Sequence, residues 1–154
     1  MKLVVKIVTP RDDLETLVDH INAAEWDEVN EMQTYAVDAL RSYLEVRDTV
    51  FATCYLHSGD SRNFAGMASG RFEQKPYDFE KWLYIDEVDT CSNLRKRGAG
   101  TALMKKLLEI ADENDCDEVW LGAEARNSLA NSFYESLEPD SIDAVVGYTF
   151  EIDD

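Results

Sequence analysis

The sequence is poor in cysteine and histidine, and these shortages exclude several classes of protein. Its three cysteines, Cys54, Cys91 and Cys116, are widely spaced and odd in number. They therefore form neither a disulfide framework nor a Cys-x-x-Cys metal pair. The only two histidines are His20 and His57, and no His-Glu-x-x-His pattern occurs. We therefore expect no metal site, and we expect each cysteine to be a small buried or half-buried residue.

Long hydrophobic runs are also missing. No apolar stretch approaches the ~20 residues that a membrane-spanning helix needs. The first residues contain no long apolar segment followed by a small-residue cleavage site, so they do not resemble a secretory signal. We expect a cytoplasmic protein with no membrane partner.

Basic residues are scarce: 32 acidic residues stand against 15 lysines and arginines, and the net charge is −17. Such a surface argues against nucleic acid as a partner, because binding to phosphates needs basic side chains. Two interpretations of the acids stay open. They either form a solvated surface suited to solubility or high salt, which is the commoner case, or attract a cationic substrate.

The apolar pattern predicts one α/β (α+β) domain over residues 1–154, with the element order βααβββαβαβ. Runs rich in Val, Ile and aromatic residues predict strands at 2–9, 49–56, 64–72, 82–90, 118–123 and 142–152. Apolar residues at helical spacing predict helices at 14–21, 32–43, 101–112 and 128–137. No repeat or linker suggests a domain boundary.

A basic, glycine-containing turn joins the fourth predicted strand to the third predicted helix. It consists of Arg95, Lys96, Arg97, Gly98, Ala99 and Gly100. The first N–H groups of a helix lack intrahelical acceptors and carry partial positive charge. Basic side chains at that end are unfavourable unless an anion binds there. The turn is therefore typical of a phosphate or pyrophosphate site.

Two common phosphate motifs do not fit this turn. A dinucleotide-binding fingerprint needs a small residue where Leu103 stands, and the P-loop pattern is absent. The pattern that remains is Arg-x-x-Gly-x-Gly, formed by Arg95, Gly98 and Gly100. It resembles the acyl-CoA pyrophosphate signature of the GNAT acetyltransferases, and the chain resembles that superfamily over its whole length. The resemblance implies a mixed central sheet flanked by helices, with acetyl-CoA as cosubstrate.

The resemblance also assigns backbone contacts to the cosubstrate. It implies that the pantetheine arm pairs with the backbone of Val88 and Thr90, where the fourth and fifth strands diverge. A free N–H there can polarise the thioester carbonyl. It further implies that N–H groups from Arg97 to Thr101 bind the pyrophosphate.

A second family pattern, Asn-x-x-Ala-x-x-x-Tyr, is formed by Asn127, Ala130 and Tyr134. It resembles the family's helix beside the thiol end of CoA. The resemblance makes Tyr134 the candidate general acid for the departing thiolate. Two simpler interpretations stay open, because Asn127 also suits a helix N-cap and Tyr134 suits a core position.

Within the superfamily the chain is most similar to the aminoglycoside 3-N-acetyltransferases, in segments 71–74, 83–88, 95–108 and 123–134. This resemblance implies acetylation of an aminoglycoside and hence antibiotic resistance, and it allows a homodimer. The alternatives are acetylation of a protein or peptide amine, acetylation of another polyamine or metabolite, and a non-catalytic acyl-CoA-binding domain. A departure from the family occurs after Tyr134, where the usual Leu-Gly-Phe-type turn is Leu137-Glu138-Pro139.

Acidic residues are the candidates for acceptor chemistry, because an ammonium must lose a proton before it attacks. By resemblance Glu87 is the candidate base, and Glu124 the candidate substrate anchor. Strand alternation predicts that Glu87 faces away from Asp86. Glu28 and Glu31 are further candidate substrate contacts, in an acidic stretch with Glu25 and Asp27. For each, a solvated carboxylate is the simpler interpretation.

Overall fold

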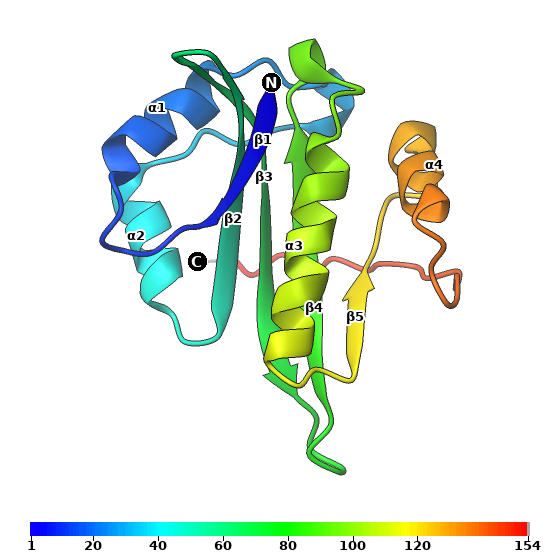
Figure 1. Cartoon of the computed structure of the whole chain (residues 1–154). Coiled ribbons are helices and arrows are strands. Elements are labelled where there is room, and N and C mark those ends of the chain that lie inside the picture. The colour runs from blue at the N-terminus through cyan, green and yellow to red at the C-terminus, as the bar shows by residue number, and fades with distance from the viewer. Residues whose placement is uncertain (154) are drawn as a thin grey trace. The chain divides into compact units, whose positions relative to one another are not determined.

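Five strands form one mixed sheet in the computed structural model, which describes residues 1–153. The sheet order is the chain order: β1 (Lys2–Ile7), β2 (Thr49–Ser58), β3 (Ser61–Gln74), β4 (Lys81–Thr90) and β5 (Glu118–Leu121). The first four strands pair antiparallel, whereas β5 pairs with β4 in parallel (Figure 1). This sheet confirms the predicted mixed α/β fold and belongs to a unit that spans residues 1–121.

Helices cover both faces of this sheet. They are α1 (Leu14–Ala23), α2 (Val37–Glu45) and α3 (Ala99–Glu113), with short 3-10 turns η1 (Glu28–Asn30) and η2 (Ser92–Leu94). Met67 of β3 packs in the cluster of buried residues that includes α1 and α2. A Cβ built on the neighbouring Gly66 would lie 3.3 Å from Leu103 of α3. Because adjacent strand residues point to opposite faces, α3 lies across the sheet from α1 and α2.

The helices that bound the predicted site form as their sequences indicate. Asp13 caps α1 by accepting a hydrogen bond from the N–H of Thr16 at 3.1 Å. The predicted apolar stripes are buried in α1, at Leu14, Leu17, Val18 and Ile21, and in α3, at Leu103, Met104, Leu107 and Ala111. Leu108, which the apolar pattern also assigns to the α3 stripe, is instead 48% exposed. Of the cysteines, Cys54 and Cys91 are buried and Cys116 is half-buried, as predicted, and all three are free. Among residues 1–153, no helix combines the length and the apolar character that crossing a membrane demands.

The helix predicted from residue 32 begins only at Val37. Ala36 before it is extended, with φ −127° and ψ 141°. The side chain of Asn22 holds the backbone of Tyr35 on both sides: its Nδ2 donates to the Tyr35 oxygen at 3.0 Å, and its Oδ1 accepts from the Tyr35 N–H at 2.9 Å. These two bonds satisfy the backbone groups that a helix would have paired, so the apolar stripe continues in an extended segment.

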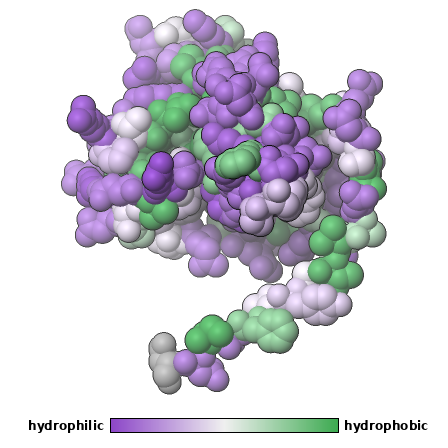
Figure 2. Space-filling view, turned by 90° about the horizontal axis from the view of Figure 1, so that it is seen from below, coloured by the Kyte–Doolittle hydropathy of each residue, from purple (hydrophilic) through white to green (hydrophobic). Residues whose placement is uncertain are grey.

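The second unit begins at residue 122 and contains α4 (Ser128–Ser136). The strand predicted at 142–152 does not form, so that prediction is wrong, and the order of the described residues is βααβββαβα. The segment has the alternation of a strand, but its apolar side chains are exposed, including Tyr148 at 80% and Phe150 at 85%. Figure 2 shows hydrophobic residues, in green, exposed along this end of the chain. A strand exists only through its ladder bonds, and here the described chain supplies none.

A β-bulge interrupts the pairing of β3 with β4. Ser69 lies opposite Glu87 and Gly70 opposite Ile85, so Asp86 is an extra residue on β4. The backbones approach so closely there that a Cβ on Gly70 would lie 2.5 Å from the carbonyl oxygen of Tyr84. Only glycine fits this position without displacing the strand.

We therefore expect Gly70→Ala to destabilise the protein by about 1–3 kcal/mol, because the added methyl forces β3 and β4 apart. Urea unfolding followed by circular dichroism measures the change. Gly147→Ala is the matched control, since a Cβ there meets no atom within 4 Å. Equal stability of the two variants would contradict the close approach at the bulge.

Candidate active site

The basic turn has the geometry of an anion site. Gly98 is the residue before α3 and has φ 89°, and no side chain caps the helix. The first turn of α3 contains no acidic residue, and the N–H groups of Ala99, Gly100 and Thr101 precede the first intrahelical bond, from Ala102 to the Gly98 oxygen at 2.9 Å. Three basic side chains at 95–97 are exposed beside them. An anion placed here would be bound by both dipole and charge.

One of the basic residues is tied to the segment that follows α1. A guanidinium nitrogen of Arg95 donates to the Asp27 carboxylate. Nearby, the N–H and the hydroxyl of Ser92 both donate to the carbonyl oxygen of Glu25, at 2.8 and 3.1 Å. Hydrogen bonds and an ion pair thus connect residues 25–27 to Ser92 and Arg95, which precede or begin the turn. An anion bound at Arg95 would compete with Asp27 for the same guanidinium.

The strand that leads to the turn, β4, has no strand neighbour on its β5 side over its second half, among the described residues. The β4–β5 pairing runs from Trp82–Glu118 to Ile85–Leu121 and stops there. Beyond Ile85, the β5 side of β4 has no strand neighbour among the described residues, and this part includes Val88 and Thr90. An unpaired strand edge offers N–H and C=O groups to an extended ligand.

The bulge directs neighbouring acids to one face, which corrects the predicted alternation. Asp86 accepts a hydrogen bond from Arg71, whose guanidinium lies 5.2 Å from the centre of the Tyr84 ring. Burial, and then the charge of Asp86, raise the pKa of Tyr43. Burial first, and then the charges of Glu87 and Asp89, raise the pKa of Tyr35 to about 12. Both tyrosines lie at α2 or just before it. The prediction that Asp86 and Glu87 face opposite ways is therefore wrong, because the extra residue shifts the alternation by one.

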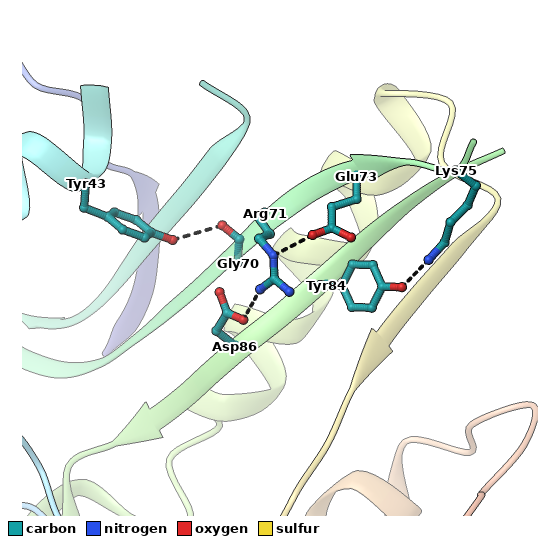
Figure 3. A network of polar contacts seen from close by, with 7 residues as sticks. All are labelled: Tyr43, Gly70, Arg71, Glu73, Lys75, Tyr84 and Asp86. Atoms are coloured by element: carbon teal, nitrogen blue, oxygen red, sulfur yellow. Dashed lines mark hydrogen bonds and ion pairs between the residues drawn. The ribbon is translucent and has the colours of Figure 1, made fainter. Parts of the chain in front are cut away.

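Figure 3 shows the polar contacts along this face. The Tyr43 hydroxyl donates to the Gly70 oxygen at 2.9 Å, beside the bulge. Arg71 donates from Nε to Glu73 at 2.9 Å and from Nη1 to Asp86. Further along, the Lys75 ammonium bonds the Tyr84 hydroxyl. Asp86 is therefore neutralised by a cation, whereas the structure shows no basic side chain paired with Glu87 among residues 1–153.

A cavity of about 340 Å³ opens on the same face, and its wall includes Ser69, the register partner of Glu87. Tyr35, Tyr43 and Phe51 also line it. The charge of Glu87 contributes to the raised pKa of Tyr35. An aromatic hollow on the same face as the carboxylates of β4 suits a ligand with apolar and cationic parts.

Asp89 is a member of this face that the sequence analysis did not select. Its residue is only 9% exposed, and its Oδ2 is buried without a hydrogen-bond partner among residues 1–153. Burial, and then the neighbouring Glu87, raise the pKa of Asp89 to about 7. The available signal was spacing: two acids two residues apart on one strand share a face.

The other acidic candidates of the first unit are solvated. Glu28 begins η1 and Glu31 ends it with φ 46°, and both are exposed. Neither lines the cavity.

The remaining predicted residues belong to the second unit. Asn127 caps α4 by accepting from the N–H of Ala130 at 3.0 Å, as its residue type suggested. Tyr134 is half-buried, with its ring centre 5.2 Å from that of Phe133. Glu124 is exposed, and its carbonyl oxygen accepts from the side chain of Asn131 at 2.8 Å. The residues predicted to contact the pyrophosphate and the pantetheine arm, and Glu87, belong to the first unit.

Solved structures with similar folds include several acetyltransferases. An aminoglycoside acetyltransferase from an uncultured soil metagenomic sample, in complex with sisomicin, superposes with a TM-score of 0.83 at 18% identity, over 98% of this chain and 97% of that one. A ribosomal-protein-alanine N-acetyltransferase from Brucella melitensis gives 0.74 at 14% identity, over 97% of this chain and 100% of that one. At these identities the likeness shows a shared fold.

A sequence relative is N-alpha-acetyltransferase 30 from Xenopus laevis, 43% identical over 54 residues, which are 35% of this chain and 20% of that protein. The human N-alpha-acetyltransferase 30 matches at the same identity and over the same share of this chain, and over 15% of its own length. The match thus spans a fifth or less of these relatives. The model of the acetyltransferase (GNAT) family, whose members use acetyl-CoA, matches residues 17–138. This match covers most of the chain, which therefore belongs to the acetyltransferase (GNAT) family.

Proposed function

We propose that this protein transfers the acetyl group of acetyl-CoA to an amine of a cationic small molecule, with an aminoglycoside acetylated at its 3-amine as the first candidate. The observation that carries the proposal is the placement of Asp86, Glu87 and Asp89 on one face of β4, the face on which the aromatic cavity opens. The same strand has a free edge and leads directly to the basic turn.

The cosubstrate fits the features of the first unit. The exposed basic side chains and the open N–H groups from Arg97 to Thr101 suit the pyrophosphate. The unpaired edge at Val88 and Thr90 suits the amide-bearing pantetheine arm, and an N–H of this edge is the donor for the thioester oxygen. Asn127 is proposed to act beside the thiol end, a role additional to its capping of α4.

The reaction moves protons at the acceptor nitrogen and at the leaving sulfur. The acceptor ammonium loses one proton to Glu87, and the neutral amine then attacks the thioester carbonyl. The C–S bond breaks, the nitrogen loses its second proton to solvent, and the sulfur leaves as a thiolate that Tyr134 protonates. The Tyr134 phenolate then regains a proton from solvent. A phenol with a pKa of ~10 donates to the thiolate of a stronger acid, with a pKa of ~8.5, only when it is well positioned.

The acceptor assignment is supported by charge and by fold. A net charge of −17 favours the approach of a polycation, and Glu28, Glu31 and Glu124 are exposed carboxylates suited to anchoring its other amines. Aminoglycoside acetyltransferases share the fold over nearly the whole chain.

A protein or peptide amine is the second candidate, favoured by the local match to N-alpha-acetyltransferase 30 at 43% identity. A peptide N-terminus is also a cation that must be deprotonated, so the acids on β4 serve either acceptor. A homodimer stays a prediction, which light scattering in solution tests.

The acceptor is decided by incubating the protein with acetyl-CoA and a panel of aminoglycosides, spermidine and N-terminal peptides. We expect CoA release with at least one aminoglycoside, and a KM for it that rises with salt because screening weakens its attraction to the acids. Tyr134→Phe and Glu87→Gln are each expected to lower kcat by about 10²-fold or more. Turnover of peptides alone would transfer the assignment to the second candidate, and binding of acetyl-CoA without any turnover would overturn both.

We expect Arg95→Ala to weaken acetyl-CoA binding about tenfold, because a charged hydrogen bond to the pyrophosphate is lost. Isothermal titration calorimetry measures the dissociation constant. Arg47→Ala is the matched control, since that side chain is 95% exposed at the end of α2. Asp27→Ala frees Arg95 from its ion pair and is expected to leave binding equal or tighter. Weaker binding in Asp27→Ala would show that the ion pair, rather than the free guanidinium, supports the cosubstrate.

A further inference from the structure

We propose that Asp89 is a positioning residue for the reaction, which shares a proton with Glu87 so that the two carboxyls together accept the proton that the acceptor ammonium loses. The inference deepens the proposed function and rests on it. It assigns the base role to a pair on β4, whereas the family resemblance made Glu87 the candidate base.

The geometry of β4 brings the two carboxyls together. They are two residues apart on a strand that is regular beyond the bulge, and their register partners Met67 and Ser69 are likewise two apart on β3. They differ in exposure: Glu87 is exposed, whereas Asp89 is 9% exposed behind it. One member therefore reaches the acceptor and the other is buried.

A hydrogen bond between them requires a proton. Glu87 and Asp89 lie two residues apart on one face of β4, and the charge of Glu87 adds to burial in raising the pKa of Asp89. Two neighbouring carboxyls form a hydrogen bond with each other only when one of them is protonated. The second oxygen of Asp89 is buried with no partner among residues 1–153, so the protein supplies no cation or N–H that would hold Asp89 ionised. The proton is the only counter-charge that the described surroundings supply.

The other groups facing the pair do not replace it. From the segment before α2 comes Tyr35, which stays a neutral phenol because burial and the two acids raise its pKa to about 12. The Tyr43 hydroxyl of α2 donates hydrogen bonds to the backbone oxygens of Gly70 and Val50, at 2.9 and 3.1 Å. On α1, His20 is engaged with the Tyr55 hydroxyl at 2.7 Å. Across the bulge, Asp86 is held by Arg71.

The proton balance follows from two states of the pair. When both carboxyls are ionised, their mutual repulsion makes the pair a stronger base than one carboxylate. It takes one proton from the ammonium, and the product is a singly protonated pair with a hydrogen bond between its members. After acetyl transfer this proton passes from exposed Glu87 to solvent, which restores the doubly ionised pair.

The test is the pH dependence of kcat for the best acceptor of the panel, in the wild type and in Asp89→Asn. We expect the wild-type rate to rise with an apparent pKa near 7, as the shared proton is lost. In the variant no proton is shared with Asp89, so the limb near 7 is lost and the plateau falls about tenfold, because the pair no longer takes the proton.

Asp86→Asn is the matched control, because Asp86 is an acid of the same face that pairs with Arg71 and not with Glu87. We expect it to move the limb by less than about half a unit, since exposed charges are screened. A uniform loss of rate in Asp89→Asn with an unmoved limb, or an equal shift in both variants, would overturn the shared proton. A wild type that acetylates no amine overturns the proposed function itself, which makes the two failures distinguishable.

Stability gives a readout that needs no activity. The folded pKa of Asp89, about 7, lies above its ordinary value of 3.8. Between these pH values the folded state binds more protons than the unfolded state, so stability decreases as pH rises through this window. The amide introduced by Asp89→Asn cannot ionise. We therefore expect the difference in melting temperature, variant minus wild type, to be larger at pH 8 than at pH 5 by about 3 °C or more. An unchanged difference would mean that Asp89 titrates normally, and would overturn the inference.

Discussion

One extra residue in β4 determines how the chemistry of this GNAT-family protein is arranged. Asp86 has no partner in the β3–β4 ladder, and every side chain after it points to the opposite face from the one that strict alternation assigns. Without the bulge, Glu87 and Asp89 would point toward α3, into the apolar layer around Leu103 and Leu107. With it, they point toward Tyr35 and the cavity. The bulge in turn depends on Gly70, whose missing Cβ lets the two backbones approach.

The same strand separates two electrostatic environments. Its α1–α2 face has three acids within four residues, and its end leads to the basic turn at 95–97. Two ion pairs lie at these places: Arg71 with Asp86 on the acidic face, and Arg95 with Asp27 at the basic turn. Beside each ion pair lies a polar group that has no partner of opposite charge among the described residues. The unpaired groups are Glu87 on the acidic face and the open N–H groups of α3 at the turn. A cationic acceptor and an anionic cosubstrate are the ligands that these groups suit.

Local patterns in the sequence were sufficient for the strands that form a sheet and for the helices with a clear apolar stripe. α1 and α3 follow their stripes because nothing competes with helix formation there. The segment 32–36 shows the limit, since Asn22, thirteen residues before Tyr35, supplies the bonds that a helix would have formed. The segment 142–152 shows another, because strand alternation says nothing about whether a partner exists. The bulge was not predictable from spacing, and the face of Glu87 could not be assigned correctly without it.

Charge also explains why a buried acid is compatible with this site. An ionised Asp89 is unfavourable in the free protein, because its environment is dry and its neighbour is negative. An ammonium bound at Glu87 offsets both the cost of burying an ionised Asp89 and its repulsion by Glu87. Binding of the acceptor therefore favours loss of the shared proton. By linkage, a doubly ionised pair binds the cation more tightly than a singly protonated pair. On the proposed mechanism, the base thus becomes fully ionised when the group it must deprotonate is in place. A neutral ligand in the same cavity would give no such gain, so the pair selects for cationic acceptors.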